Sequence, residues 1–384
     1  MKKKIMSLCL VLAMAAMTLA GCGGSSAGSD TFKIGGIGPT TGGAAVYGIA
    51  VRNAAELAIK EVNAAGGING YQIEYKFEDD ELDNEKSVNA YNTLKDWGMN
   101  MLIGSVTSGC CTAVAAESSN DNMFQLTPSG SSTDCTANND NVFQVCFSDP
   151  NQGIGAAQYI GSNNLATKVA IIYDSSDVYS SGIYEKFVAE AANQPFEVVS
   201  TEAFTADSKT DFSVQLQKAS DAGADLVFLP IYYTEASLIL TQANTMGYAP
   251  KFFGCDGLDG ILGVENFDTS LAEGVMLLTP FAADAEDAAT QKFVSDYKAA
   301  YGDIPNQFAA DAYDAIYIIK AAAEKADAKP SDSVADLGTK MEDAMRTITV
   351  DGLTGAAMSW DADGAVNKAP KAMQIINGNY SLIQ

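Results

Sequence analysis

Small hydroxyl residues follow two strand-like runs in the first half of the sequence. The segment VTSG, which contains Ser108, comes after the run 101–105, and SGSS, which contains Ser129 and Ser131, comes after the run 123–128. At the start of a helix, such residues present a hydroxyl together with free backbone N–H groups, and this combination suits a carboxylate. The alternative is that Ser108 and Ser131 only cap their helices, as residues of this type usually do.

Aromatic and acidic residues follow other strand-like runs. Tyr47 ends the loop after the first run, Tyr179 follows KVAIIYD, Tyr232 follows ADLVFLP, and Asp256 follows KFFGC. Each has an ordinary interpretation as well, since many tyrosines are simply half-buried and Asp-Gly is a turn sequence. Open parallel sheets, however, bind ligands beyond the carboxyl ends of their strands. The shared placement of these residues therefore favours a ligand site in which hydroxyl and N–H groups face aromatic rings and an acid.

Catalysis is not expected from this set of residues. The chain contains no histidine, which removes Ser-His and Cys-His arrangements and histidine-based metal sites. It has no GxSxG or GxxxxGK motif, and GIGPTTG carries Thr41 where the dinucleotide-binding pattern GxGxxG needs its last glycine. We therefore expect a binding protein with no catalytic residues, no cofactor and no metal.

Strand-like runs and helical stretches alternate from Phe32 onward, and this alternation predicts an α/β fold with parallel sheets covered by helices. The helical stretches show apolar residues at helical spacing along one side. The strand-like runs are 32–37, 72–79, 101–105, 123–128, 168–174, 224–230, 251–255 and 274–280, and the helical stretches include 47–65, 288–301, 306–326 and 333–346.

Two such series follow one another, with breaks near residues 148–150 and 279–280. The late helices have no complete set of strands of their own, so we expect them to complete the first lobe. The predicted first lobe is 32–148 plus 280–355, and the predicted second lobe is 149–279 plus 356–384, where GAAMSWDADGAV and KAMQIING supply a turn and strands. Three crossings between the lobes would form a hinge of separate strands.

The first residues form a secretory signal. Three lysines precede an apolar run that ends in LAGC, and this run is too short to span a bilayer comfortably. Cys22 in that position resembles the acylated cysteine of a bacterial lipobox. We expect a signal peptide over 1–21, lipidation at Cys22, and a flexible tether over 22–31 that holds an extracytoplasmic domain at the membrane.

Charge and cysteine content narrow the partners further. Three of the 23 basic residues lie in the signal, which leaves 20 against 48 acidic residues; this balance repels nucleic acid. Five cysteines remain beyond the signal and the lipidation position, and their spacing fits no zinc template. Export makes a disulfide chemically possible, but the sequence assigns no connectivity to these residues, which are Cys110, Cys111, Cys135, Cys146 and Cys255.

The order of motifs resembles the branched-chain amino acid type of periplasmic binding proteins, which are the solute receptors of ABC transporters. The resemblance covers essentially all of 32–384, and its most specific parts are GGINGYQIEY and the TPSGSS loop; IGGIGPTTGG, MLIGSVTSG, ADLVFLPIYYTEA and FFGCDG follow in the expected order. It implies two Rossmann-like lobes joined by three strands, a type I periplasmic binding protein fold.

The resemblance also implies roles for single residues. Ser108 would hold the ligand carboxylate, the backbone carbonyl of Ser129 would accept from the ammonium, and Ser131 would bind near both groups. Asp256 stands where leucine-binding members have Glu and would pair with the ammonium. The aromatic positions that would wall the ligand are Tyr47, Tyr179, Tyr232 and Tyr313. The cysteine pair of some members is missing, with Leu82 and Thr107 near those places.

These observations together predict a lipid-anchored, monomeric receptor that captures an amino acid, branched-chain or similar, and delivers it to an ABC permease in the membrane. Two alternatives stay open at this point. The same body could serve as the ligand-binding part of a sensor, or it could bind a related small amide or carboxylate.

Overall fold

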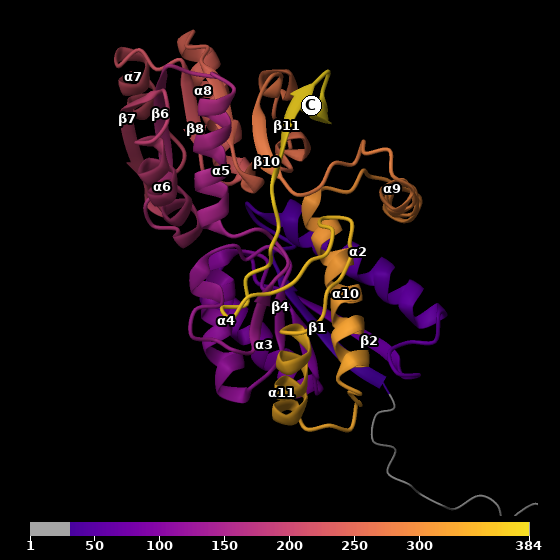
Figure 1. Ribbon diagram of the computed structural model, residues 1–384. Helices are drawn as coiled ribbons and strands as arrows, with labels where there is room; N and C mark the ends of the chain where they lie inside the picture. Colours follow the sequence, from indigo (N-terminus) through magenta and orange to yellow (C-terminus); the bar gives the residue numbers. More distant parts are fainter. Residues whose placement is uncertain (1–30, 384) are drawn as a thin grey trace, which may run out of the picture.

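The computed structural model of the chain describes residues 31–383. Within that range the protein folds into two α/β lobes, each built on one sheet (Figure 1). The predicted α/β class with two parallel-sheet lobes is confirmed. The strands are β1 Thr31–Gly38, β2 Gln72–Asp79, β3 Met101–Ile103, β4 Gln125–Thr127, β5 Val142–Gln144, β6 Lys168–Asp174, β7 Glu197–Phe204, β8 Leu226–Leu229, β9 Lys251–Gly254, β10 Met276–Thr279, β11 Lys371–Ile376 and β12 Asn379–Leu382.

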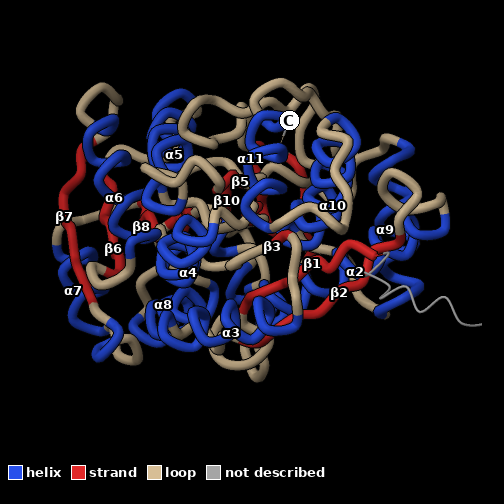
Figure 2. The backbone as a smooth tube through the Cα atoms, turned by 90° about the horizontal axis from the view of Figure 1, so that it is seen from below, coloured by secondary structure: helices blue, strands red, loops and turns tan. Residues whose placement is uncertain are grey.

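The helices lie on the faces of these sheets. Helices α2, α3, α4, α10 and α11 pack on the first sheet or on one another, and α5 to α8 surround the second (Figures 1 and 2). Their bounds are α2 Ala45–Ala64, α3 Asn84–Trp97, α4 Ser108–Asp121, α5 Asp149–Ser162, α6 Val178–Ala191, α7 Ser213–Asp221, α8 Tyr233–Met246, α9 Ala288–Tyr301, α10 Gln307–Lys325 and α11 Val334–Met345.

The first sheet has the strand order β2-β1-β3-β4-β5, and all of its pairings are parallel. Parallel sheets are covered on both faces, so their strands are apolar along most of their length. Strand β1 shows this pattern, because Phe32, Ile34 and Ile37 are fully buried. Burial of one such side chain stabilises the fold by about 1.5–3 kcal/mol relative to its exposure.

The second sheet has the order β12-β11-β10-β9-β8-β6-β7. Strands β6 to β10 pair in parallel, whereas β11 runs antiparallel to both β10 and β12. The last strands of the chain thus join the second lobe. Strands β5 and β7, which the sequence did not predict, lie at one edge of each sheet, where a short or half-exposed strand gives a weak apolar signal.

Polar caps fix where several helices begin and end. Asp83, Asp177 and Asp287 each accept a hydrogen bond from a backbone N–H in the first turn of the following helix, which satisfies a donor that the helix itself leaves free. Gly247 and Gly302 end α8 and α9 in the left-handed conformation, which glycine adopts at little cost.

The chain crosses between the lobes three times. The crossings are the segments 145–148, 280–287 and 367–370, after β5, after β10 and before β11. The segment before the last crossing differs from our expectation. The sequence predicts 356–384 in the second lobe, but Met358, Trp360 and Val366 pack in the core of the first lobe, and Trp360 Nε1 donates to the carbonyl oxygen of Gln144. The reason is that these apolar side chains are buried against the first sheet, where Trp360 contacts the edge strand β5.

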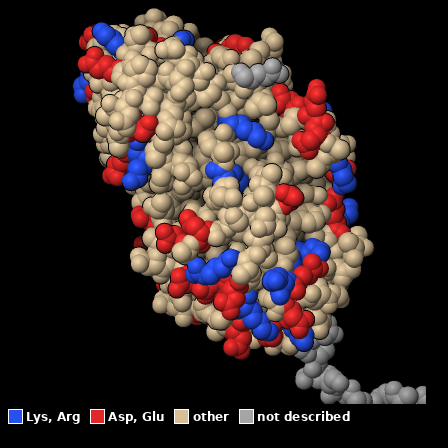
Figure 3. All heavy atoms as spheres, viewed as in Figure 1, with Lys and Arg blue, Asp and Glu red and all other residues tan. Residues whose placement is uncertain are grey.

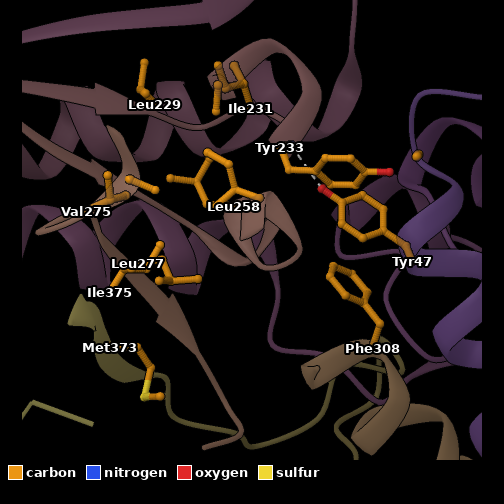
Figure 4. Packing of buried hydrophobic residues seen from close by; sticks show 14 of the residues in the cluster. Tyr47, Leu229, Ile231, Tyr233, Leu258, Val275, Leu277, Phe308, Met373 and Ile375 are labelled. Carbon is orange, nitrogen blue, oxygen red and sulfur yellow. Dashed lines mark hydrogen bonds between the residues drawn. The ribbon is translucent and has the colours of Figure 1, made fainter. Parts of the chain in front are cut away.

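One apolar cluster joins the two lobes. Tyr47 from the first lobe lies between Phe308 of the same lobe and Tyr233 of the second, and Leu258 of the second lobe belongs to the same cluster (Figure 4). The rings of Tyr47 and Phe308 have centroids 4.1 Å apart, and those of Tyr47 and Tyr233 are 4.9 Å apart in an edge-to-face arrangement. Aromatic pairs of this kind add about 0.5–1.5 kcal/mol beyond the area they bury. The lobes are therefore in close contact in this conformation.

The sequence also predicts an N-terminal signal and tether, no membrane-spanning helix after the signal, and no particular disulfide. The signal, Cys22 and residues 22–30 of the predicted tether lie outside the described residues, whereas Thr31, the last residue of that tether, begins β1. Between residues 31 and 383 no helix combines the length and apolar character that a bilayer crossing requires. The five cysteines in that range are all buried and unpaired, which answers the open question of connectivity.

Candidate functional site

A small cavity lies between the two lobes, and most of the predicted site residues line it. Ser108, Ser129 and Tyr47 contribute from the first lobe, and Tyr179, Tyr232 and Asp256 contribute from the second; the other lining residues are Val106, Thr107, Gly257 and Phe308. The enclosed volume is about 10 Å³, which is the room that a single water molecule needs. A ligand of amino-acid size therefore enters only when the lobes move apart.

Ser108 lies at the first position of α4, directly after Thr107 at the N-cap. Its hydroxyl oxygen accepts hydrogen bonds from the backbone N–H groups of Ser131 (3.2 Å) and Ser132 (3.1 Å). With its oxygen engaged in this way, the hydroxyl keeps its proton for donation. The site thus combines an O–H donor with the N-terminus of a helix, whose dipole favours a negative group. This is more than the capping role that local sequence alone suggested.

The loop that carries Ser129 and Ser131 is held in place by hydrogen bonds within the first lobe. The Ser129 hydroxyl donates to the Val106 carbonyl oxygen at 2.6 Å, and the Thr127 hydroxyl oxygen accepts from the Gly130 N–H at 2.7 Å. A Cβ atom at Gly130 would lie 2.8 Å from Thr127 Oγ1 and from Cys111 Cβ, so the loop approaches α4 too closely for a larger residue. Ser131 is buried behind Ser108 and is not on the cavity wall.

Asp256 provides the only carboxylate on the cavity wall. Its Oδ1 accepts a hydrogen bond of 2.7 Å from the Tyr179 hydroxyl, and its backbone N–H donates to Gln152 Oε1 at 3.1 Å. Burial raises the pKa of Asp256 to about 7, although the hydrogen bond from Tyr179 favours the ionised form. A cationic group beside this carboxylate would restore its charge, because an opposite charge favours ionisation.

Aromatic rings form the rest of the wall. The rings of Tyr179 and Tyr232 stack with centroids 5.0 Å apart, and Tyr47 meets Tyr232 edge-on at 5.7 Å. Phe308, from the first turn of α10, packs against Tyr47 on the side opposite Tyr233 (Figure 4). The cavity therefore offers a polar end at Ser108 and Asp256, and apolar ring faces around the remainder.

Tyr313, which we expected among these rings, lies elsewhere. Its hydroxyl donates to Glu61 Oε2 on α2, and its ring packs against Phe293. Phe308 takes the expected place on the wall. Both residues belong to α10, but five positions along a helix turn a side chain by about 140°, so only one of them points into the cavity. The sequence signal that could have identified Phe308 as a site residue is its position, as an aromatic residue directly after the start of α10.

Asp149 is a second buried acid near the site that the sequence analysis did not select. Both of its carboxylate oxygens, the Ser131 hydroxyl and Gln152 Nε2 are buried without a hydrogen-bond partner. Burial raises the pKa of Asp149 well above its ordinary value, and the nearby charge of Asp256 adds to this effect. Buried polar groups in proteins are normally hydrogen-bonded, so this cluster behind the cavity wall has unused capacity to bind polar groups.

Hydrogen bonds across the cleft hold the two lobes together around the cavity. The Thr234 hydroxyl in the second lobe donates to the Gly43 carbonyl oxygen in the first at 2.6 Å. In the opposite direction, Gln307 Nε2 at the start of α10 donates to the Asp256 carbonyl oxygen at 2.9 Å. The segment that carries Asp256 is therefore fixed from both lobes in the closed form.

We also considered whether the described side chains could coordinate a metal ion. Across residues 31–383 no group of three or more Cys, Asp or Glu side chains is arranged to hold a metal ion. The site offers hydrogen-bond donors, one acid of raised pKa and ring faces, which together bind and orient a solute. Two lobes that close on such a cavity define a protein of the two-lobed solute-binding class.

Comparison with known proteins agrees with this class. Residues 31–379 match the family model described as periplasmic binding protein. The chain is 31% identical to the Leu/Ile/Val-binding protein homolog 3 of Brucella melitensis, over 85% of this chain and 89% of the relative. It is 28% identical to a leucine-, isoleucine-, valine-, threonine- and alanine-binding protein of Pseudomonas aeruginosa, over 84% and 86% of the two chains.

The crystal structure of the branched-chain amino acid transporter substrate-binding protein LivJ from Streptococcus pneumoniae, in complex with isoleucine, superposes with a TM-score of 0.82 at 29% identity, covering 91% of this chain and 98% of that one. The chain belongs to the periplasmic binding protein family, whose members bind solutes outside the cytoplasm without catalysis. The expectation of a non-enzymatic binding protein with a type I periplasmic binding protein fold is confirmed.

Proposed function

We propose that this protein captures an α-amino acid with an apolar side chain between its lobes and passes it to the permease of an ABC importer. One observation carries the proposal: the proton-donating Ser108 at a helix start and the carboxylate of Asp256 line the same cavity from opposite lobes. An α-amino acid has a carboxylate and an ammonium on one carbon atom, so it would satisfy both groups at once.

Individual residues take distinct roles in this proposal. Ser108 and the N–H groups at the start of α4 bind the carboxylate, and Asp256 with the Ser129 carbonyl oxygen binds the ammonium. Ser131 and Asp149 add their unused hydrogen-bonding capacity from behind the wall. The side chain then lies among the aromatic rings of Tyr47, Tyr179, Tyr232 and Phe308. The named ligands of the relatives from Pseudomonas and Streptococcus support branched-chain amino acids as the first candidates.

Calorimetry and thermal unfolding test this assignment. The protein is unfolded and refolded to remove any bound solute, and then titrated with leucine, isoleucine and valine. At a hundred times its dissociation constant, a ligand should stabilise the fold by about 2.7 kcal/mol. N-acetyl-leucine, which has no ammonium, and isopentylamine, which has no carboxylate, serve as matched controls and should bind weakly. If none of the twenty amino acids raises the melting temperature, the assignment is wrong.

We also propose that the protein is monomeric and attached to the membrane through Cys22, with 22–31 as the tether. Cys22 and residues 22–30 lie outside the described residues, Thr31 is the first residue of β1, and the argument for the anchor rests on the LAGC sequence at the end of the apolar run. Expression of the full chain and of Cys22→Ala, followed by membrane fractionation, checks this. The wild type should sediment with membranes and the variant should be soluble; equal distribution of the two would exclude the anchor.

A further inference from the structure

A second cavity lies beside the first and is also lined by residues of both lobes. Its volume is about 460 Å³. Thr107 from the first lobe and Tyr232 from the second line both cavities, so these two side chains lie between the two spaces. The large cavity is therefore placed where a group that projects from a ligand in the small cavity could extend. We call it the outer cavity.

The wall of the outer cavity is strongly acidic. Five of its residues are acids, from both lobes, and only one is basic; the acids are Asp83, Glu85, Asp174, Asp177 and Glu235. Lys209 is the single basic residue, and its Nζ lies 3.3 Å from Glu235 Oε1. Among the residues that the structure describes, none of the other four acids takes part in an ion pair. The wall therefore carries an excess of acidic over basic side chains.

An unpartnered hydroxyl lies at the junction of the two cavities. Thr107 is only 4% exposed, and its Oγ1 has no hydrogen-bond partner. Although Thr107 occupies the N-cap of α4, its side chain does not cap the helix. A buried hydroxyl without a partner costs free energy, and a polar group passing between the cavities would supply the missing partner.

Apolar surface completes the outer cavity. Phe204, Ile231 and the ring of Tyr232 line it together with the acids. Such a wall suits a chain of methylene groups that ends in a cation, since the methylenes bury apolar area and the charged end stays among carboxylates. A branched aliphatic side chain has no charged group to place among these acids.

We propose that the outer cavity is a subsite for the basic end of a long ligand side chain, so that the protein binds lysine-like amino acids as well as short apolar ones. This rests on the proposed function, because the α-carboxylate and α-ammonium remain with Ser108 and Asp256. The aliphatic part of the side chain passes Thr107 and Tyr232, and the terminal ammonium lies among the acids of both lobes.

Calorimetry with two amino acids isolates the terminal charge. Norleucine has the same four-carbon side chain as lysine without the ε-ammonium, so the ratio of the two affinities reports the outer cavity alone. The refolded wild type should bind lysine at least as tightly as norleucine. In the double variant Asp83→Asn/Asp177→Asn the ratio of lysine to norleucine affinity should fall at least ten-fold, because Asn preserves both helix caps and removes two charges.

Asp268→Asn is the matched control. Asp268 caps a helical turn of the second lobe as Asp177 does, by accepting from the N–H two residues further on, but it lies outside the outer cavity. This variant should keep the wild-type ratio. If leucine and norleucine bind and lysine does not, or if the double variant keeps the wild-type ratio, the subsite is refuted while the proposed function stands. If no amino acid binds, the proposed function fails and the subsite fails with it.

Discussion

The phenolic oxygen of Tyr47 lies 2.5 Å from the carbonyl oxygen of Gly257 and donates a hydrogen bond to it. This contact joins α2 of the first lobe directly to the residue after Asp256 in the second. The same phenolic oxygen accepts a longer hydrogen bond, 3.4 Å, from the Tyr233 N–H. One buried hydroxyl thus links the first lobe to two segments of the second lobe at the edge of the ligand cavity.

We expect Tyr47→Phe to shift the free protein toward an open conformation. The substitution keeps the ring on the cavity wall and removes the two hydrogen bonds, each of which contributes about 1 kcal/mol. Small-angle scattering of the ligand-free protein should show a larger radius of gyration. Tyr248→Phe is the control, because that hydroxyl bonds to the Ala224 carbonyl oxygen within the second lobe. Identical scattering from Tyr47→Phe and wild type would contradict the prediction.

Asp256→Asn should weaken amino-acid binding by roughly 2–5 kcal/mol, the range for truncated buried charge pairs. The amide fills nearly the same volume but leaves the ligand ammonium without a counter-charge. Glu265→Gln, at an exposed acid of the same lobe, should bind like wild type when both are measured by calorimetry. Near-wild-type affinity of Asp256→Asn would place the ammonium elsewhere, with Asp149 as the next acid to test.

The affinity of the protein for its amino-acid ligand should rise with pH through the neutral range. The pKa of Asp256 is about 7 in the free protein, and the ammonium needs the ionised carboxylate, so binding below pH 7 must release a proton. Other acids near Asp256 include Asp149 and Asp311, whose pKa values are also raised by burial, and they act in the same direction. Calorimetry at pH 6 in two buffers of different ionisation enthalpy measures the released proton; net proton uptake would exclude this linkage.

The stability of the free protein should change in the opposite sense. Because the folded pKa of Asp256 lies above that of an unfolded Asp, the protonated carboxyl favours the fold at acid pH, and this contribution is lost as pH rises from about 4 to 7. The loss amounts to about 4 kcal/mol at most for this group. Asp256→Asn should flatten the fall in melting temperature between pH 5 and 8; an unchanged slope would show that other acids dominate.

Breaking the buried ion pair beside the last crossing should destabilise the fold strongly. Lys368 Nζ lies 2.8 Å from Asp311 Oδ1, and the two side chains are 1% and 2% exposed. Lys368→Met leaves Asp311 buried without a partner, which costs about 3–5 kcal/mol in the free energy of unfolding. Lys340→Met, at the more exposed pair with Asp332, should cost less than about 1 kcal/mol. Urea unfolding of both variants measures the difference.

The sequence predicted the regular elements well because their signals are local. Helix α9 begins and ends at the predicted residues, and α10 and α11 differ by one residue at each end. Strand β7, in contrast, lies at a sheet edge, and all of its residues except Phe204 are exposed or half-exposed, so it lacks the continuous apolar run of a central strand. The segment 356–366 contains a turn and apolar residues that fit either lobe, and the packing of Met358, Trp360 and Val366 assigns it to the first.

Residues of the candidate site could be predicted from the sequence where they directly follow the end of a strand. Ser108, Tyr179 and Asp256 were found in this way, and the structure places all three on one cavity. Asp149 was missed because an acid beside a proline at a helix start is an ordinary sequence; its importance comes from two unpartnered oxygens, which only the packing around it reveals. Tyr313 and Phe308 both lie on α10 and point in different directions. Because α10 is buried on several sides, the sequence does not show which of the two faces the cavity.

The three crossings between the lobes also limit how the protein can move. Because three separate spans of chain join them, the lobes slide and twist less freely than lobes joined by a single span would. When the lobes close on a ligand, the distance between a surface of the first lobe and a surface of the second changes, whichever ligand is bound. A membrane partner that contacts both surfaces would therefore distinguish a loaded receptor from an empty one by shape alone, without touching the solute.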